Sequence, residues 1–331
     1  MIDIEDREQQ LAYLMNRGIE VSSVQRLEGG VSNRVVLVRP ESGRPFVMKQ
    51  ALPKLRVQVD WFCTPARIER EALGLKYLAE LVPGNVPELL FEDSEHYLLA
   101  MEAVPEPHRN WKSMLMAGEL FPEHVMSFGR LLGTIHVNSA RRSAELLPIF
   151  EDRSIYETLR IEPYYRYTAS RVPAAADFLN ALIEDTYATQ AALVHGDYSP
   201  KNILIHQDRL ILLDCEVVHF GDPCFDVGFS MAHLLSKTHH LKQHRAKFAE
   251  AACEYWSAYC GYARAEAMEA RAVRHSLACC LARVAGRSPL EYLDATERAN
   301  QQSVTVELMA NPPERIPDLV EGFVERIACR S

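Results

Sequence analysis

The feature that most constrains this chain is a polar interruption in an apolar run, LVHGDYSPKNILI at residues 193–205. A strand that only filled a core would not place a carboxylate, a proline and a carboxamide between its apolar ends. We therefore expect two short strands joined by a loop that presents Asp197 and Asn202 to a ligand. The apolar run RLILLD follows and ends at Asp214. It is predicted to be the partner strand.

The residue types in this stretch fit the transfer of a phosphoryl group. Such a reaction needs a carboxylate that orients and deprotonates a hydroxyl, together with oxygen ligands for Mg²⁺. Asp197 and Asn202 lie five residues apart, and Asp214 follows twelve residues later. A carboxylate and a carboxamide from separate loops can hold Mg²⁺ against the phosphates of a nucleotide, because this ion prefers hard oxygen donors.

HGDYSPKN resembles the catalytic loop of the aminoglycoside phosphotransferase and choline kinase-like small-molecule kinases, which reads His-Gly-Asp-x-x-x-x-Asn. The resemblance implies an ATP-dependent phosphotransferase with an alcohol acceptor. It makes Asp197 the catalytic base, Asn202 and Asp214 the Mg²⁺ ligands, and His195 a brace for the loop. Asp226, in the following FGDPCFDVG, is expected to hold the loop backbone rather than to contact substrate.

The N-terminal part agrees with a kinase, which needs a lid over the phosphates of ATP and a lysine that contacts them. The segment EGGVSN lies between two predicted strands. By resemblance, its lid residues that bind the nucleotide are Gly29, Gly30, Ser32 and Asn33. Lys49, in FVMK on the third predicted strand, is the candidate phosphate lysine.

A carboxylate on the next helix should orient that lysine. RIEREAL offers Glu69 and Glu71, which point to different faces of a helix because they are only two residues apart. The family pattern Arg-Glu-x-x-x-Leu favours Glu71 and leaves Glu69 to solvent. LLAMEAVPEP resembles the family hinge, so the backbone of 102–104 is expected to bind the adenine edge.

The hinge residues predicted to bind the nucleotide are therefore Met101, Glu102 and Val104. For Met101, which would lie beside the adenine, an ordinary core position is an equal alternative. Two departures from protein kinases leave further roles open. Ser199 replaces the lysine that contacts the γ-phosphate, so Ser199 and Lys201 are both candidates. Glu216, in LLDCE, is either a further carboxylate near the metal or an outward-facing side chain.

The distribution of elements predicts an α+β chain with a bilobal protein kinase-like fold. Residues 1–103 read as a β-rich N-lobe that holds the lid, the phosphate lysine and the hinge. Residues 104–331 read as a mainly helical C-lobe that holds the catalytic loop, the metal site and the acceptor pocket. The helices are expected around residues 4–17, 65–81, 122–139, 174–188, 225–238, 243–260, 265–285 and 312–328, the last one started by Pro312–Pro313.

The charge distribution narrows the acceptor. The net charge is −9, which argues against a nucleic-acid partner. Residues 1–102 carry 12 basic and 16 acidic side chains, so the acidity is spread along the chain and gives no concentrated acidic pocket for aminoglycosides. A neutral or mildly charged metabolite is favoured, and sugars, amino alcohols and choline-like acceptors stay open. An aromatic cage for a quaternary ammonium competes with ordinary core packing for Trp111, Tyr164, Tyr165, Tyr167, Trp256 and Tyr259.

The same composition indicates a cytoplasmic protein without a membrane partner. No apolar run approaches the ~18–20 residues of a membrane span, and the acidic N-terminus lacks the features of a signal peptide. The eight cysteines form no CxxC pair and are expected to be free thiols. The sequence selects neither an oligomeric state nor ATP over GTP.

One alternative function belongs to a different class, namely a catalytically inactive nucleotide-binding regulator of the same fold. This alternative is disfavoured because Asp197, Asn202, Asp214 and Lys49 all have residue types that are competent for catalysis. Protein phosphorylation is disfavoured too, because the segment after Asp214 reaches a predicted helix near Phe225 within a dozen residues and contains no Ala-Pro-Glu anchor.

Overall fold

The structure is a computed structural model that describes residues 1–27, 32–56 and 60–330. The chain forms two compact units. The N-terminal unit comprises Met1–His108 and Ile211–Val217, and the C-terminal unit comprises Arg109–Leu210 and Val218–Ser331. The first contains a five-stranded sheet and the second is mainly helical, which confirms the predicted α+β class.

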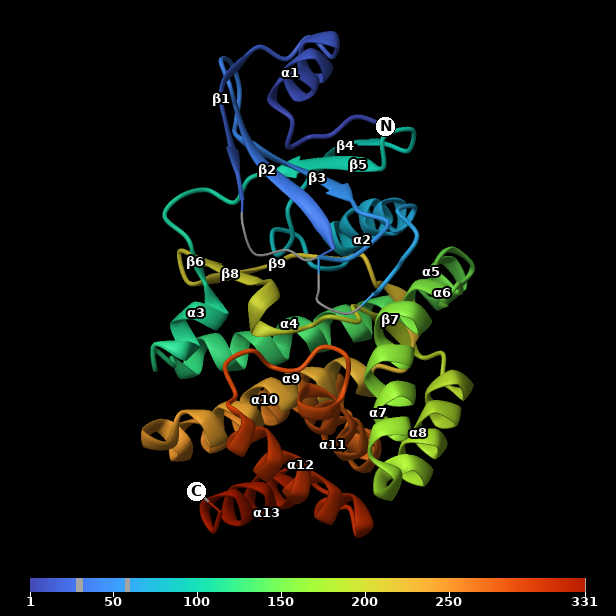
Figure 1. Cartoon of the computed structure of the whole chain (residues 1–331), viewed down its shortest axis with the longest axis vertical. Coiled ribbons are helices and arrows are strands. Elements are labelled where there is room, and N and C mark those ends of the chain that lie inside the picture. Colours follow the sequence, from blue (N-terminus) through green and yellow to red (C-terminus); the bar gives the residue numbers. More distant parts are fainter. Residues whose placement is uncertain (28–31, 57–59, 331) are drawn as a thin grey trace. The chain divides into compact units, whose positions relative to one another are not determined.

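The N-terminal unit is built on an antiparallel sheet in the order β1-β2-β3-β5-β4 (Figure 1). Its strands are β1 (Val21–Arg26), β2 (Asn33–Pro40), β3 (Phe46–Ala51), β4 (Leu89–Asp93) and β5 (Leu98–Glu102). Two helices accompany the sheet, α1 (Arg7–Asn16) and α2 (Arg67–Leu81). The two helices and the strands β1, β2 and β3 fall on the segments that the sequence predicts.

Alternation along β3 separates the core from the site. Successive side chains of a strand point to opposite faces of its sheet. Met48 belongs to the apolar core that also contains Leu14 of α1 and Val36 of β2. Its neighbour Lys49 therefore points to the other face, and α2 packs against β3, β4 and β5. The alternation of side chains along β3 therefore places Lys49 on the face of the sheet where α2 packs. Helix α2 carries Glu71, its candidate partner.

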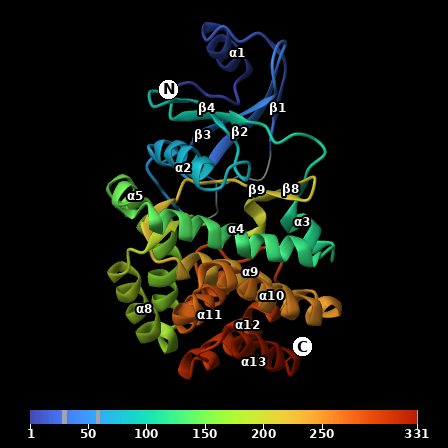
Figure 2. The same ribbon diagram turned by 180° about the vertical axis from the view of Figure 1, so that it is seen from behind.

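The C-terminal unit is a set of packed helices (Figures 1 and 2). The helices in its first half are α3 (Trp111–Met116), α4 (Pro122–Arg141), α5 (Ser143–Phe150), α6 (Ser154–Tyr156), the π-helix η1 (Glu157–Arg166), α7 (Tyr167–Arg171) and α8 (Ala176–Ala188). Those in its second half are α9 (Cys224–His240), α10 (Arg245–Ala263), α11 (Glu269–Ala285), α12 (Ala295–Ala310) and α13 (Ile316–Ala328). Short 3₁₀ turns cover Pro173–Ala175, Pro200–Asn202, Lys242–His244 and Glu266–Met268.

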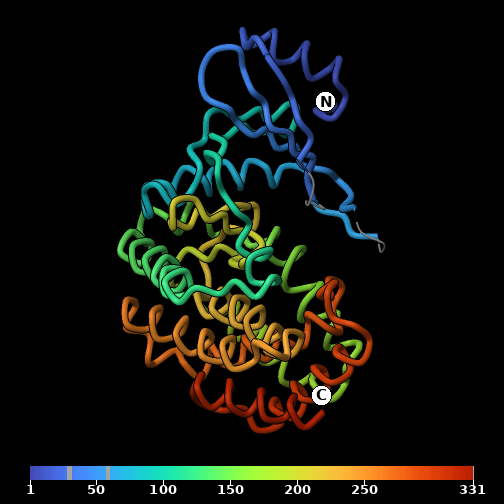
Figure 3. Tube along the Cα trace, turned by 90° about the vertical axis from the view of Figure 1, so that its left-hand side faces the viewer, coloured from blue at the N-terminus to red at the C-terminus, as the bar shows by residue number. Residues whose placement is uncertain are grey.

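Helix α9 is the centre of this unit, because it packs against α10, α11, α12 and α13 (Figure 3). Every residue from Cys224 to His239 is buried. At Gly228 the helices approach so closely that an added Cβ would lie 2.5 Å from the backbone of His275 in α11. A larger residue at Gly228 would therefore force α9 and α11 apart.

The quoted loop lies between two strands as predicted, β7 (Ala192–Val194) and β8 (Ile203–His206). β7 pairs with β10 (His219–Gly221), whereas β8 belongs to a sheet in the order β6-β8-β9. β6 is Arg109–Asn110 and β9 is Arg209–Leu212. Within the part of the chain that the structure describes, no helix is long and apolar enough to cross a membrane. All eight cysteines are free, as expected.

The predicted helices are confirmed with shifts of a few residues at their ends. The C-terminal one begins at Ile316 with Pro317 in its first turn, so the prediction that Pro312–Pro313 start it is wrong. The sequence patterns did not predict the π-helix η1, helix α12 or the shorter helices α3, α5, α6 and α7.

Candidate active site

A buried lysine organises the site of the N-terminal unit. The Lys49 ammonium donates to Glu71 Oε1 and to Asp214 Oδ1, each at 2.5 Å. The side chain of Glu71 is fully buried, and that of Lys49 is 8% exposed. Burial alone would lower the pKa of Lys49, but the charges of Asp214 and Glu71 outweigh it and raise the pKa above its ordinary value. The lysine is therefore held as a cation.

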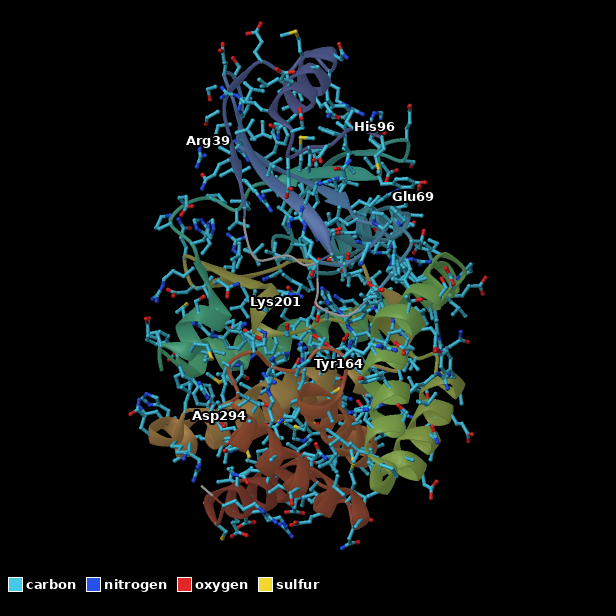
Figure 4. The ribbon with its side chains drawn as sticks, in the orientation of Figure 1. Arg39, Glu69, His96, Tyr164, Lys201 and Asp294 are labelled. Carbon is cyan, nitrogen blue, oxygen red and sulfur yellow. The ribbon has the colours of Figure 1, made fainter. Side chains whose placement is uncertain are left out.

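The arrangement distinguishes the two glutamates that the sequence offered. Glu71 lies on the inner face of α2, and Glu69, labelled in Figure 4, is partly exposed. Asp214, which contacts Lys49, lies in the segment Ile211–Val217, and this segment folds with the N-terminal unit. The segment is attached there by a backbone hydrogen bond from Leu212 N to Asn85 O at 2.7 Å. Asp214 has a φ of 69°, in the left-handed region that few residue types adopt.

Glu216 points inward. Its Oε2 accepts from Arg67 Nε at 3.0 Å and from Asn33 Nδ2 at 3.1 Å. Arg67 is fully buried and also donates to the carbonyl groups of Ser32 and Leu52. Arg67 and Glu216 thus form a buried ion pair that fixes the start of β2, next to the predicted lid.

Three carboxylates of the N-terminal unit fit a divalent cation. Glu71, Asp214 and Glu216 each offer an oxygen, and these three atoms lie within 4.8 Å of one another. Glu71 Oε2 is buried without a hydrogen-bond partner in the described part of the chain. Such an ion would share these carboxylates with the Lys49 ammonium, which already contacts Glu71 and Asp214.

The HGD loop belongs to the C-terminal unit, and the side chain of Asp226 in α9 binds its backbone. The Asp226 carboxylate accepts from His195 N at 2.6 Å and from Gly196 N at 2.8 Å. Burial opposes its ionisation, but the hydrogen bond and charge of His136 outweigh burial and keep the pKa of Asp226 below its ordinary value. The predicted contact of Asp226 with the loop backbone is present. His195 Nδ1 accepts from Asp197 N at 3.2 Å, which braces the turn.

The Asp197 carboxylate is held on both oxygens. Arg160 Nη2 lies 3.2 Å from Oδ1, and Asn202 Nδ2 donates to Oδ2 at 2.8 Å. Lys201 Nζ, on a half-exposed side chain labelled in Figure 4, lies 3.9 Å from Oδ2. The buried Ser199 Oγ has no hydrogen-bond partner within the described ranges. Asp197 and Asn202 are therefore in direct contact.

Two arginines in these contacts were not found from the sequence. Arg67 precedes Glu71 by one helical turn, so a basic residue on the same face of α2 was a usable signal. Arg160 had no such signal, because it lies in the π-helix η1, whose period differs from that of an α-helix.

The hinge segment has few backbone groups left for a ligand. Glu102 N donates to Glu88 O, and Ala103 N donates to Pro45 O. Among the described residues no partner is recorded for the amide of Val104, which leaves it as the donor in this segment. Met101 is 6% exposed. Gly29 and Gly30 lie outside the described residues, whereas Ser32 and Asn33 are buried at the end of the lid.

Comparison with known proteins was made on the whole chain. Residues 23–269 match the family model described as the phosphotransferase enzyme family. Methylthioribose kinase from Pectobacterium carotovorum subsp. carotovorum is 27% identical over 244 residues, which are 64% of this chain and 60% of that protein. Methylthioribose kinase 2 from Oryza sativa subsp. japonica is 25% identical over 252 residues, 68% of this chain and 59% of that protein. The chain thus spans about three-fifths of the length of these curated relatives.

Two solved structures share the fold. Amicoumacin kinase in complex with AMP-PNP, Ca²⁺ and Ami superposes with a TM-score of 0.61 at 14% identity, covering 92% of this chain and 94% of that one. A choline/ethanolamine kinase family protein from Mesorhizobium loti superposes with a TM-score of 0.59 at 17% identity, covering 99% and 100%. The expected bilobal protein kinase-like fold is confirmed.

Proposed function

Because the chain belongs to the phosphotransferase enzyme family, we propose that it is an ATP-dependent kinase that phosphorylates a hydroxyl of a small molecule. The observation that carries the proposal is the buried Lys49, held at 2.5 Å by both Glu71 and Asp214. A cation fixed in this way matches the lysine that contacts the phosphates in kinases.

The nucleotide is assigned to residues 1–103. The lid residues Gly29, Gly30, Ser32 and Asn33 cover the phosphates, and Lys49, kept in position by Glu71, binds them. The backbone around Glu102 and Val104 contacts the adenine edge, with Met101 beside the ring. In support, Asn33 is tied through Glu216 to the segment that carries Asp214, so the end of the lid and the predicted metal site share one hydrogen-bond network.

Asp214 and Asn202 are the proposed Mg²⁺ ligands. Their carboxylate and carboxamide oxygens are the donors that Mg²⁺ prefers. The ion would neutralise charge on the transferred phosphoryl group. Because Asn202 Nδ2 donates to Asp197, its Oδ1 is the atom left to act as a ligand.

Asp197 is the proposed base. Its carboxylate is fixed by Arg160 and Asn202, and the loop beneath it is fixed by Asp226, so little reorientation is needed when a hydroxyl arrives. The carboxylate accepts the hydroxyl proton as the acceptor oxygen bonds to the γ-phosphorus, while the bond from that phosphorus to the β,γ-bridging oxygen breaks and ADP leaves. Residues 104–331 are proposed to supply this loop and the acceptor pocket. The names of the related proteins support a small hydroxylated acceptor.

The proposal is tested by a turnover screen with ATP, Mg²⁺ and a panel of hydroxylated metabolites. The wild-type chain is expected to phosphorylate at least one of them, and chelation by EDTA to abolish the reaction. Asp197→Asn should reduce kcat by about 10²–10⁴-fold while leaving ATP affinity within a factor of about two, because the base acts only in the chemical step.

Asp208→Asn is the matched control, since this exposed aspartate follows β8 and pairs with His124. Near-wild-type turnover by Asp197→Asn would remove the base assignment. ATP binding without turnover of any acceptor would favour the inactive nucleotide-binding regulator instead.

A further inference from the structure

The C-terminal unit contains a cluster of cations that the catalytic roles above do not require. We name Arg160, Lys237 and Arg283 the cationic cluster. Arg160 and Arg283 contact the same two rings, because both guanidinium groups lie 5.1–5.6 Å from the centroids of Tyr164 and Phe229. Arg160 also contacts the proposed base, so this pair of arginines lies beside the position where the acceptor hydroxyl must bind.

Two members of the cluster lack a carboxylate partner in the described part of the chain. Arg283 donates to Ser288 and lies 3.1 Å from His233 Nε2, and its buried Nε has no partner. Lys237 is fully buried; among the described residues its ammonium donates to His233 O of its own helix and lies 5.5 Å from the centroid of the Tyr292 ring. A buried ammonium with one hydrogen bond and one ring contact is incompletely solvated.

The carboxylates nearby are already engaged. Asp197 is shared by Arg160, Asn202 and Lys201. At the rim of the same region, Glu291 pairs with Lys112, and Glu162 pairs with Arg287. The local charge therefore remains positive around Tyr164.

The pKa values of Lys237 and His233 reflect their burial and the positive charges around them. Burial lowers the pKa of Lys237 to about 7; the charges of Lys112 and Arg283 add to the effect, and the charge of Glu291 opposes it without cancelling it. Burial, followed by the charges of Arg283 and Lys237, also lowers the pKa of His233 well below its ordinary range. Like charges held together in a buried site destabilise the folded protein unless a ligand balances them.

We propose that the acceptor is a hydroxylated anion whose carboxylate or phosphate binds Arg283 and Lys237 while its hydroxyl faces Asp197. This inference rests on the proposed function and specifies its substrate class. A guanidinium forms paired hydrogen bonds with either anion, and the buried ammonium adds a point charge. The faces of Tyr164 and Tyr167 already carry arginines, with Arg287 4.3 Å above Tyr167. A choline-like cation would be repelled there.

The proposal narrows two expectations from the sequence. The sequence favoured a neutral or mildly charged acceptor, whereas the proposal favours an anion. The reason is that the local charge around Tyr164 is positive, although acidic residues are spread evenly along the whole chain. The aromatic cage loses support too: Trp111 packs on Phe128 and Trp256 on Tyr259 in the core.

The test compares acceptors that differ only in charge. One series is glycerate, glycerol and 3-amino-1,2-propanediol, with glycerol 3-phosphate to separate phosphate from carboxylate. The second is glucuronate, glucose and glucosamine, which share the pyranose ring. We expect kcat/KM for an anionic member to exceed that of its neutral and cationic counterparts by about tenfold or more, the value of one charge-assisted hydrogen bond.

The variant Arg283→Met should raise KM for that anion about tenfold or more, with kcat and KM for ATP unchanged. Arg274→Met is the matched control on the same helix, since Arg274 pairs with Asp185 at the surface. A rise in KM for ATP instead would assign the cluster to the nucleotide and overturn the proposal.

A measurement of acceptor binding without catalysis distinguishes failure of the anion inference from failure of the proposed kinase function. The anionic members should raise the Tm of Asp197→Asn, and this rise should be lost when Arg283→Met is added. If neutral or cationic members are phosphorylated best, the inference is wrong and the kinase function stands. If the anions bind but no acceptor in the wider panel is phosphorylated, the kinase function fails. If no anion of either series raises Tm, the anion site is refuted.

Discussion

At the scale of the residue, the site depends on which of two neighbouring glutamates faces inward. Glu69 and Glu71 are two positions apart on α2, and only Glu71 reaches Lys49. Helical geometry separates their directions by about half a turn, so one is buried when the other is not. The sequence could predict this pair because the resemblance to the family pattern Arg-Glu-x-x-x-Leu selects Glu71, while helical geometry shows only that the two glutamates cannot share the role.

The two glutamates provide a matched experiment. Glu71→Gln removes the charge that fixes Lys49 and should lower kcat/KM by about 10²-fold, since phosphates would then meet a lysine engaged by Asp214 alone. Glu69→Gln, which alters a partly exposed side chain, should stay within a factor of about two. Steady-state kinetics at varied ATP measures both. Equal losses in the two variants would contradict the assigned orientation of α2.

At the scale of the element, regular periods were predictable and irregular ones were not. Helices such as α4 and α10 repeat apolar residues every three to four positions, so their segments could be identified from the sequence. The π-helix η1 bonds from i to i+5, and Pro163 lies inside it. A pattern search at 3.6 residues per turn does not identify a π-helix, so it gives no reason to place Arg160 beside the HGD loop. The arginine on the proposed base was missed for this reason.

Helix α9 yields a stability prediction, because Lys237 is buried within it. The pKa of Lys237 falls from 10.5 to about 7 on folding. Between these values the unfolded chain binds more protons than the folded one, so the free energy of unfolding rises with pH. Below pH 7 the folded protein bears the full cost of the buried charge. Lys237→Met should therefore raise stability most below pH 7, with the gain shrinking toward pH 10.5.

Urea unfolding at pH 6, 8 and 10 measures this trend. The control is Lys247→Met, which changes an exposed lysine on α10 and should leave stability within about 0.5 kcal/mol at every pH. A stabilisation by Lys237→Met that does not depend on pH would mean that packing, rather than charge, sets the effect.

At the scale of the whole molecule, the two units are not consecutive in the chain. The sequence predicts one boundary, between residues 103 and 104. In the structure, Ile211–Val217 returns to the N-terminal unit and brings Asp214 and Glu216 with it. Local sequence patterns predict helices and strands. They do not indicate that a seven-residue segment belongs to a unit far away in the sequence, which it contacts through a buried ion pair. The contacts of Glu216 with Arg67 could not be inferred without the fold.

The return of this segment predicts the behaviour of a fragment. Residues 1–108 alone lack Glu216 and leave the buried Arg67 without its carboxylate, a defect of about 3–5 kcal/mol. Such a fragment should unfold at much lower urea than the same fragment joined by a glycine-serine linker to residues 211–217, as measured by circular dichroism. A third fragment with that linker and Glu216→Gln should behave like the first. Equal stability of the first two would contradict this account.

The same return has a consequence for biosynthesis. A ribosome makes the five strands of the sheet within the first 102 residues, yet the partner of Arg67 is added only after more than a hundred further residues. A nascent chain paused before residue 211 therefore holds an incomplete N-terminal unit, however long the pause lasts. The part of the molecule that is translated first is among the last to reach its final stability.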